Sequence, residues 1–397
     1  MNQVKNLLLV ALVAYGISAF SSDCVPLSGQ FIIGSGENSD YSTLTEAIDA
    51  LKCGGVSGKV TFLIENGTYN EKIVLGSVKG ASASNTINFE SQSRNNTDVI
   101  IRHSTADATM ILNSASNVSF ENITVDHKAS TYGNCLKVDG SSGNIRFKGV
   151  VFEGVEAART GANNAVIYFT PNVPKSDVVF EDCEINNGSS GIYKGGSSPD
   201  SKDMRTSVSG TLFFNQYENG LVLSNEESPI ITNNVISSLT KYSSYKAISL
   251  ENCSGNLMVS NNIVNASNGA YGLSLTNCSA EPSMLGQINN NSIAVGGESE
   301  AFGIYLGGST DNQVINFNRV KLSINGAPGP KHAFYKNAGS GNNVNMLNNI
   351  LYDLNSGGYT IVGNSYKDLF NQLPSQSNPA LAVSANGIMI EKVTPIK

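Results

Sequence analysis

The stretch AISLENCSGNLMVSNNIVNAS, residues 247–267, decides the fold. Apolar residues alternate at Ile248 and Leu250, a polar turn follows, and a second short apolar run passes through Leu257. The pair Asn261-Asn262 then precedes a third apolar step. Alternation over a few residues is typical of a half-buried strand, whereas asparagine is a poor strand former. The stretch therefore predicts three short strands with an asparagine-bearing corner before the third.

The same pattern returns along the chain. GLSLTNCSAEPSMLGQINNNSIAV begins at residue 272 and GIYLGGSTDNQVINFNRVKLS at residue 303, which places Asn262, Asn291 and Asn318 at equivalent corners, 29 and 27 residues apart. A period of about 20–50 residues in an all-β sequence indicates stacked coils. Asparagine tolerates left-handed backbone angles, and stacked amides form hydrogen-bonded ladders. Extrapolation places further members of this corner at Asn122, Gly149, Asp182, Asn215, Asn234, Asn349 and Asn364.

Composition agrees with a solenoid. The 397 residues include 39 Gly and 11 Pro, and only 14% are charged, so turns are frequent and long amphipathic helices are not expected. A solenoid grows along one axis, so this length does not require several domains. The net charge of −7 and the pI of about 5.1 argue against a chain that wraps nucleic acid.

The N-terminus has the layout of a secretory signal peptide. Lys5 is followed by the apolar run NLLLVALVAYGISAF and then by small residues at a cleavage position, so residues 1–21 are predicted to be removed. A buried N-terminal helix or strand is the alternative. Asp23 stands where a lipoprotein needs a small residue before Cys24. The mature protein is therefore expected to be secreted, extracellular or on the cell surface, with the periplasm left open, and no other segment is expected to span a membrane.

Six cysteines in an exported chain permit disulfides without requiring them. Cys253 and Cys278 occupy the same place in adjacent repeats, so they should stack at about the 4.8 Å strand spacing, where either a bridge or an unoxidised sulfur ladder fits; we expect the ladder. Cys24 and Cys53 could join the N-terminal arm to a capping helix.

One helix is well signalled, in TLTEAIDALKCGG. Thr43 and Glu46 have the spacing of a capping box, and Gly54-Gly55 ends the helix. Its apolar residues lie on one face, namely Leu44, Ala47, Ile48 and Leu51. Because a solenoid exposes an apolar end, we expect this helix to cap it. The predicted organisation is an N-terminal strand and capping helix in 22–55, a parallel β-helix in 56–366 and a closing tail in 367–397.

The sequence resembles a known superfamily at its N-terminal end. DYSTLTEAIDAL followed by VTFLIENGTYNEKI is similar to the opening of pectinesterases and of the wider pectin-lyase-like superfamily, and closer still to β-helix proteins secreted by Bacteroidetes-type bacteria. The opening match covers roughly residues 31–75, the repeats continue a fold-level resemblance to about residue 366, and the tail resembles segments that close such helices. The resemblance implies an all-β, right-handed parallel β-helix. It does not imply one activity, because this fold hosts lyases, hydrolases, esterases, epimerases and binding proteins.

The sequence departs from the superfamily pattern at residues that bear on which of the superfamily's activities it could have. The chain has no Trp and no counterpart of the pectinesterase aspartate strands, which argues against esterase activity. Glu71 matches a superfamily position that is mainly structural. The strand NITVDHKAS is similar to the "WIDH"-like strand of pectate lyases at Asp126-His127, but no arginine-proline motif accompanies it.

Charged residues converge around that strand. His103 and His127 lie 24 residues apart in segments that align as consecutive coils, which places Arg102 over Asp126. The following coil adds Glu153 to the same column, and Lys128 and Lys148 lie nearby in sequence. The candidate catalytic residues are Arg102, His103, Asp126, His127 and Lys128.

Such a set could abstract a proton alpha to a uronate, with Glu153 in binding. Asp126 and Glu153 could also hold Ca²⁺ against an acidic sugar; no cofactor is required. Asp126 is expected to raise the pKa of His127. The alternative is that these residues form ordinary surface ion pairs.

Tyrosines recur near one strand, at Tyr193, Tyr271, Tyr305 and Tyr335. Tyr193 and Tyr305 are candidate binding residues, because tyrosine can stack on sugar rings in place of tryptophan; packing is the alternative. His332 is expected on the surface or in a turn.

Three functions stay open from the sequence. The first is a secreted protein that binds or processes polysaccharide, the second a polysaccharide lyase acting on uronate-containing glycans, and the third a non-catalytic structural or adhesin-like surface protein. Glycan is the expected partner, nucleic acid is not, and the oligomeric state is undetermined.

Overall fold

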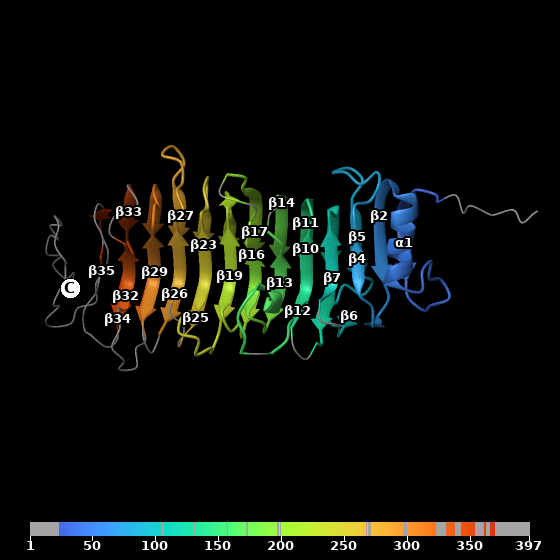
Figure 1. The fold of residues 1–397 in the computed structure, drawn as a ribbon, viewed down its shortest axis with the longest axis horizontal. Helices are drawn as coiled ribbons and strands as arrows, with labels where there is room; N and C mark the ends of the chain where they lie inside the picture. The colour runs from blue at the N-terminus through green and yellow to red at the C-terminus, as the bar shows by residue number, and fades with distance from the viewer. Residues whose placement is uncertain are drawn as a thin grey trace, which may run out of the picture.

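The computed structural model is a right-handed parallel β-helix with one α-helix at its N-terminal end (Figure 1). It describes residues 24–369 apart from 105–106, 130–131, 157, 172–173, 197, 199, 267, 269–270, 297–299, 323–330, 338–342, 354–360 and 363–365. The predicted signal peptide, Asn364 and residues 370–397 of the predicted tail lie outside the described residues.

The coils contribute strands to three parallel sheets, as the repeats predict. Sheet A contains β1 (Leu27–Ile33), β2 (Val56–Ile64), β5 (Ile87–Ser91), β8 (Ser116–Glu121), β11 (Ser142–Lys148), β14 (Lys175–Glu181), β17 (Asp203–Ser209), β20 (Glu226–Glu227), β21 (Ile230–Thr232), β24 (Met258–Ser260), β27 (Gly286–Asn289), β30 (Gln313–Asn316), β33 (Val344–Leu347) and β36 (Tyr366–Leu369). Sheet B contains β3 (Gly67–Tyr69), β6 (Val99–His103), β9 (Thr124–His127), β12 (Val151–Glu153), β15 (Glu184–Asn186), β18 (Leu212–Phe214), β22 (Val235–Ser237), β25 (Ile263–Ala266), β28 (Ser292–Val295), β31 (Arg319–Leu322) and β34 (Ile350–Asp353). Sheet C contains β4 (Ile73–Leu75), β7 (Ala108–Asn113), β10 (Asn134–Asp139), β13 (Ile167–Phe169), β16 (Ser190–Lys194), β19 (Asn219–Ser224), β23 (Lys246–Glu251), β26 (Tyr271–Thr276), β29 (Ala301–Gly307), β32 (Lys331–Lys336) and β35 (Ile361–Val362). A short 3₁₀ turn, η1 (Ala162–Asn164), lies between sheets B and C.

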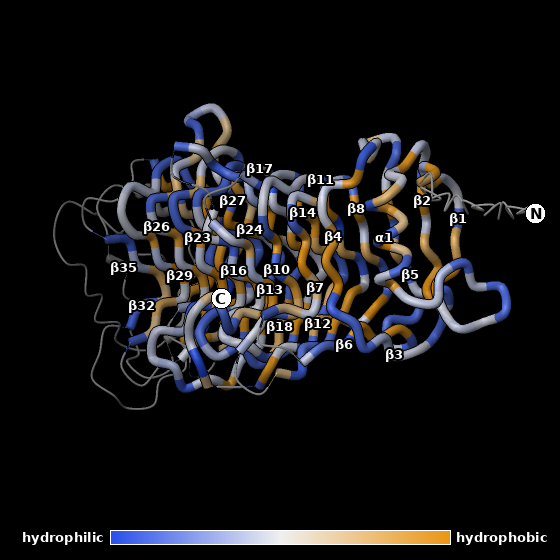
Figure 2. Tube along the Cα trace, turned by 45° about the vertical axis from the view of Figure 1, so that its right-hand side comes forward, coloured by the Kyte–Doolittle hydropathy of each residue, from blue (hydrophilic) through white to orange (hydrophobic). Residues whose placement is uncertain are grey.

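The core runs along the axis of the coils, because inward side chains alternate with outward ones along most strands. Figure 2 shows the corresponding alternation of hydrophobic and hydrophilic residues along the chain. In sheet A it is a stack of buried phenylalanine rings with centroid separations of 4.8–5.6 Å. The rings belong to Phe62, Phe89, Phe120, Phe147 and Phe180. Offset ring stacking adds to the burial of apolar surface.

The paired asparagines have two different structural roles. The first of each pair is left-handed, with φ of 57° at Asn261 and 54° at Asn290. The second is buried, and its side-chain amide donates to the carboxamide oxygen of the next coil at 2.9–3.0 Å. This buried asparagine ladder comprises Asn234, Asn262, Asn291, Asn318 and Asn349.

Four of the extrapolated corner positions were wrong. Asn122, Gly149 and Asp182 lie in the left-handed column, one residue before the ladder position, while Asn215 follows β18 at another corner. The ladder column continues toward the N-terminus through Thr211, Cys183, Val150 and Ile123. In the third apolar step, Ile263 is 52% exposed while Val264 is buried, because Asn262 takes the preceding inward position.

The capping helix α1 (Leu44–Gly54) forms as predicted and closes the N-terminal end of the core. The Thr43 side chain accepts from the Glu46 N–H at 3.1 Å. Glu71 accepts hydrogen bonds from the N–H groups of Leu44 and Thr45 at 3.2 and 2.9 Å. Glu71 is therefore a structural residue, as the superfamily resemblance implies.

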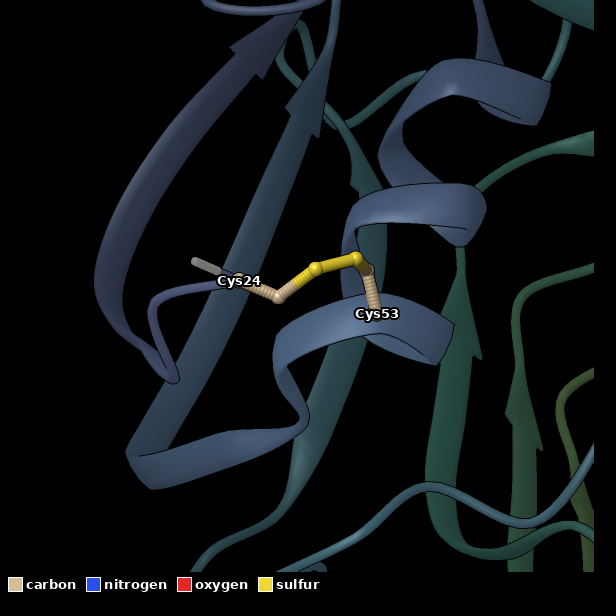
Figure 3. Close-up of a disulfide and its surroundings, with 2 residues drawn as sticks. All are labelled: Cys24 and Cys53. Atoms are coloured by element: carbon tan, nitrogen blue, oxygen red, sulfur yellow. A yellow bond between two sulfur atoms is a disulfide. The ribbon is translucent and has the colours of Figure 1, made fainter. Parts of the chain in front are cut away.

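The cysteines also follow the expectation. Cys24 and Cys53 form a disulfide between the N-terminal arm and α1, with their Cα atoms 5.3 Å apart (Figure 3). Cys253 and Cys278 are free and buried, and each thiol contacts backbone carbonyls of its own and the preceding coil. They form an unoxidised column rather than a bridge.

Candidate functional site

The predicted charged residues meet at the corner where sheet B turns toward sheet C. Arg102 on β6 pairs in register with Asp126 on β9, and Asp126 pairs with Glu153 on β12. His103 likewise lies beside His127. We call Arg102, Asp126, His127 and Lys128 the corner cluster. The alignment of these coils that was predicted from the sequence is thus confirmed by the register of the paired strands.

Asp126 is the centre of the corner cluster. Its carboxylate is almost fully buried, and its Oδ2 accepts a hydrogen bond from Arg102 Nε at 2.8 Å. Lys128 Nζ lies 3.1 Å from Oδ1 as an ion pair that lacks hydrogen-bond geometry. Two cations therefore compensate one carboxylate, and both cationic side chains keep substantial exposure, 39% and 56%.

His127 is enclosed rather than presented to solvent. Its side chain is 1% exposed, its Nδ1 lies 3.1 Å from Thr109 Oγ1, and Gly133 leaves no room for a Cβ beside Nε2. Burial lowers the pKa of His127, outweighing the opposite effects of the Tyr132 carbonyl and of Asp126. Asp126 acts on this pKa in the expected, raising direction, but the net pKa is lowered because desolvation is the larger effect. A neutral, buried imidazole cannot reach a polymer without local opening.

Glu153 and Lys148, which were also predicted near Asp126, have other partners. Glu153 Oε1 accepts from Asn186 Nδ2 at 2.7 Å, and Lys148 pairs with Glu181 on sheet A. Within the described ranges, no group of three or more His, Cys, Asp or Glu side chains could hold a metal ion. A Ca²⁺ ion at Asp126 would also have to displace Arg102 or Lys128, so Ca²⁺ at Asp126 and Glu153 stays a prediction.

A second group of ion pairs lies next to the corner cluster, and it was not predicted from the sequence. Asp107 accepts from Lys72 Nζ at 2.8 Å, and Lys137 Nζ lies 3.7 Å from its other oxygen. The hydrogen bond from Lys72 lowers the pKa of Asp107. Lys72 and Asp107 immediately precede strands of sheet C, and Lys137 lies on one. They share no motif, so only the pairing of the coils reveals them.

Tyrosines line the outer face of sheet C in one register column. Tyr168 pairs with Tyr193, and Tyr305 pairs with Tyr335. Both pairs are in ring contact, at centroid separations of 6.2 and 5.4 Å, and the second pair is stacked. All four rings are half-buried. We call these four residues the tyrosine column; Val222, Ser249 and Ser274 occupy its intervening positions.

Further rings widen the column over β26, β29 and β32. Phe302 contacts Tyr305 and Tyr335 at 5.5 and 5.3 Å and stacks on Tyr271 at 4.9 Å. Tyr271 therefore belongs to a neighbouring register position, opposite Phe302. His332, expected in a turn or on the surface, is half-buried on β32 and stacks on Tyr335 at 5.1 Å.

No family model and no curated protein matches this chain. A GH136 lacto-N-biosidase from Eubacterium ramulus has a similar structure, with TM-score 0.57 and 10% identity over 86% of this chain and 67% of that protein. The Dettilon tailspike protein gives TM-score 0.54 and 12% identity over 85% and 66%. PfbA, a surface adhesin of Streptococcus pneumoniae, gives 0.46 and 12% over 86% and 92%.

The chain thus spans about two thirds of the length of the biosidase and of the tailspike. In the part of the chain that the structure covers, no helix is long and apolar enough to cross a membrane. At these identities the likenesses concern the fold alone, which is a right-handed parallel β-helix.

Proposed function

We propose that this chain is an exported protein that binds glycan along the outer face of sheet C. The observation that carries the proposal is the tyrosine column, in which two contacting pairs of half-buried tyrosines share one register position. Aromatic rings with a polar tip suit ligands that are apolar on one face and hydroxylated at the edges.

The spacing of the column favours an extended ligand. Tyr193 and Tyr305 are separated by four strand spacings, which is about 19 Å at about 4.8 Å per coil. Small or apolar side chains fill the positions between the two pairs. A ligand that contacts both pairs must therefore lie along the helix axis, as a polysaccharide chain can.

One end of the column carries positive charge. Lys137 precedes Tyr168 in the same register, and the ion group with Lys72 and the cations of the corner cluster lie beside it. A carboxylate of a uronate could pair with Lys137 at this end, so acidic glycans are the preferred candidates.

Export is supported by the disulfide between Cys24 and Cys53, because such bonds persist in oxidising compartments. The sulfur of Cys24 is also occupied, so it is not free to carry a lipid.

Binding is tested by affinity measurements on pectate, alginate, glycosaminoglycans and a neutral glycan. The double variant Tyr305→Ala/Tyr335→Ala should weaken binding about tenfold or more, given about 0.5–1.5 kcal/mol per aromatic contact beyond area burial. The matched control is Tyr217→Ala/Tyr242→Ala, which removes a contacting tyrosine pair at 5.3 Å outside sheet C. Unchanged affinity in the first variant, or no glycan bound by the wild type, would exclude the proposal.

A uronate lyase is the second candidate, favoured by the register of Arg102, Asp126 and Glu153. Here Asp126 would take the proton and the two cations would hold the substrate carboxylate. Absorbance of an unsaturated uronide reports this reaction directly. Product formation that disappears in Asp126→Asn/His127→Ala would establish it, and absence of product with retained binding leaves a binding protein.

A further inference from the structure

One lysine and two carboxylate side chains are buried together inside the coils, away from the corner cluster and the tyrosine column. Lys194 ends β16, Asp203 begins β17 and Glu226 lies on β20, and each is at most 1% exposed. We call them the interior triad. Lys194 is inward, in the same register column as Phe169 and Leu223.

The contacts within the triad are direct. Lys194 Nζ donates to Asp203 Oδ2 at 2.6 Å and also to Glu226 Oε1. Thr206 Oγ1 donates to Glu226 Oε2 at 2.9 Å, and the Lys175 N–H donates to Asp203 Oδ1 at 3.1 Å. The Lys194 ammonium lies 5.7 Å from the centroid of the Phe169 ring. An amine, an acyl carbon and a second carboxylate are therefore held together without bulk water.

From this geometry we propose that Lys194 and Asp203 join in an intramolecular amide bond, with Glu226 as the proton carrier. A buried ion pair is costly because both charges lose their hydration. Condensation to a neutral amide removes both charges from the interior. The product would close a covalent ring around the connection between β16 and β17.

The reaction balances without an added reagent. Lys194 first gives a proton to Asp203 Oδ2, which yields a neutral amine and a carboxylic acid. Nζ then attacks Cγ, and the charge that develops on Oδ1 is stabilised by the Lys175 N–H in the manner of an oxyanion donor.

Glu226 next takes one proton from Nζ and delivers it to Oδ2, which leaves as water. One C–N bond forms, one C–O bond breaks and one water is released, while Glu226 returns to its starting state. Burial raises the pKa of Glu226, which suits a group that must accept and return a proton.

The intact mass of the denatured wild-type protein, reduced and alkylated, tests the proposal. The expected mass is one water molecule below that of the chain. Tryptic digestion should then yield a branched peptide, in which residues 176–202 carry Asp203-Met204-Arg205 through the Lys194 side chain. A full mass with ordinary cleavage after Lys194 would overturn the proposal, and so would a branch at Lys175.

Two controls test whether trypsin reaches buried lysines and whether Glu226 takes part in the reaction. Lys336 is a fully buried lysine in the same inward column, and cleavage after it in the same digest shows that trypsin reaches buried lysines once the chain is denatured. Glu226→Gln should give the full mass, because an amide cannot shuttle the proton. A Glu226→Gln protein that still lacks one water would remove Glu226 from the mechanism. The mass and the digest of the wild-type protein show whether the amide bond is present, even if the Glu226→Gln variant does not fold.

Discussion

Single residues fix the coil geometry through the difference between two adjacent asparagines. The first takes a backbone conformation that most residues avoid. The second satisfies buried backbone groups. At Asn291, Oδ1 accepts from the N–H and the side-chain amide of Asn262, while Nδ2 donates to Val259 O and Asn318 Oδ1.

The variant Asn291→Leu should therefore lose about 1–3 kcal/mol of unfolding free energy, because it leaves buried polar partners unpaired. Denaturant unfolding measures this loss. The matched control is Asn290→Gly at the exposed left-handed position, where glycine has no steric penalty at φ of 54°, so its stability should be nearly unchanged. Equal effects of the two substitutions would contradict the division of roles.

A second residue, His127, should make stability depend on pH. Because burial lowers its folded-state pKa below 6.5, the unfolded chain binds more protons at mildly acidic pH. Its contribution is fully present above pH 6.5 and is lost as the pH falls toward the folded pKa, by up to about 1.4 kcal/mol per pH unit. Urea unfolding of wild type and His127→Gln from neutral to acidic pH should show this slope only in the wild type. If the unfolding free energies of the two proteins depended on pH in the same way, the slope would belong to titratable groups other than His127.

The sequence was most informative at the level of elements. The three-strand repeat, the helix at residues 44–54 and the register of Arg102 over Asp126 were all predicted, because each follows from local periodicity or equal spacing. Prediction failed where two columns differ by one residue, since Asn122 and Gly149 satisfy the left-handed position and not the ladder. It also missed Lys194 and Glu226, because charged side chains at inward positions break the alternation from which burial is read.

The capping helix provides the prediction at the scale of an element. Glu71 accepts from two N–H groups of the first turn and from Thr45 Oγ1 at 2.6 Å, so it compensates the positive end of α1. Glu71→Gln should reduce the unfolding free energy by about 1 kcal/mol and speed amide exchange in α1. Glu46→Gln removes the same charge near the same end, yet glutamine can keep its bond to Ser42 N–H. A smaller effect at Glu46 is therefore expected, and the reverse order would reject the assigned role of Glu71.

In the whole molecule, each coil contacts mainly its neighbours along the axis, as in other solenoids. Stability should therefore be distributed along the axis instead of residing in one global core. The asparagine ladder supports the C-terminal half, from Asn234 onward, and the phenylalanine stack supports the N-terminal half, from Phe62 to Phe180.

This division predicts which strands lose protection from amide exchange when one of the two columns is disrupted. Asn291→Leu should accelerate amide exchange in β25, β28 and β31, by about tenfold for each 1.4 kcal/mol lost, while β2, β5 and β8 keep their protection. Phe120→Ala, which opens a gap in the middle of the stack, should do the opposite. Hydrogen exchange read by mass spectrometry resolves both halves in one experiment. If either substitution raised exchange uniformly from α1 to β34, the coils would unfold as one cooperative unit, and the short-range coupling inferred from the sheet order would be wrong.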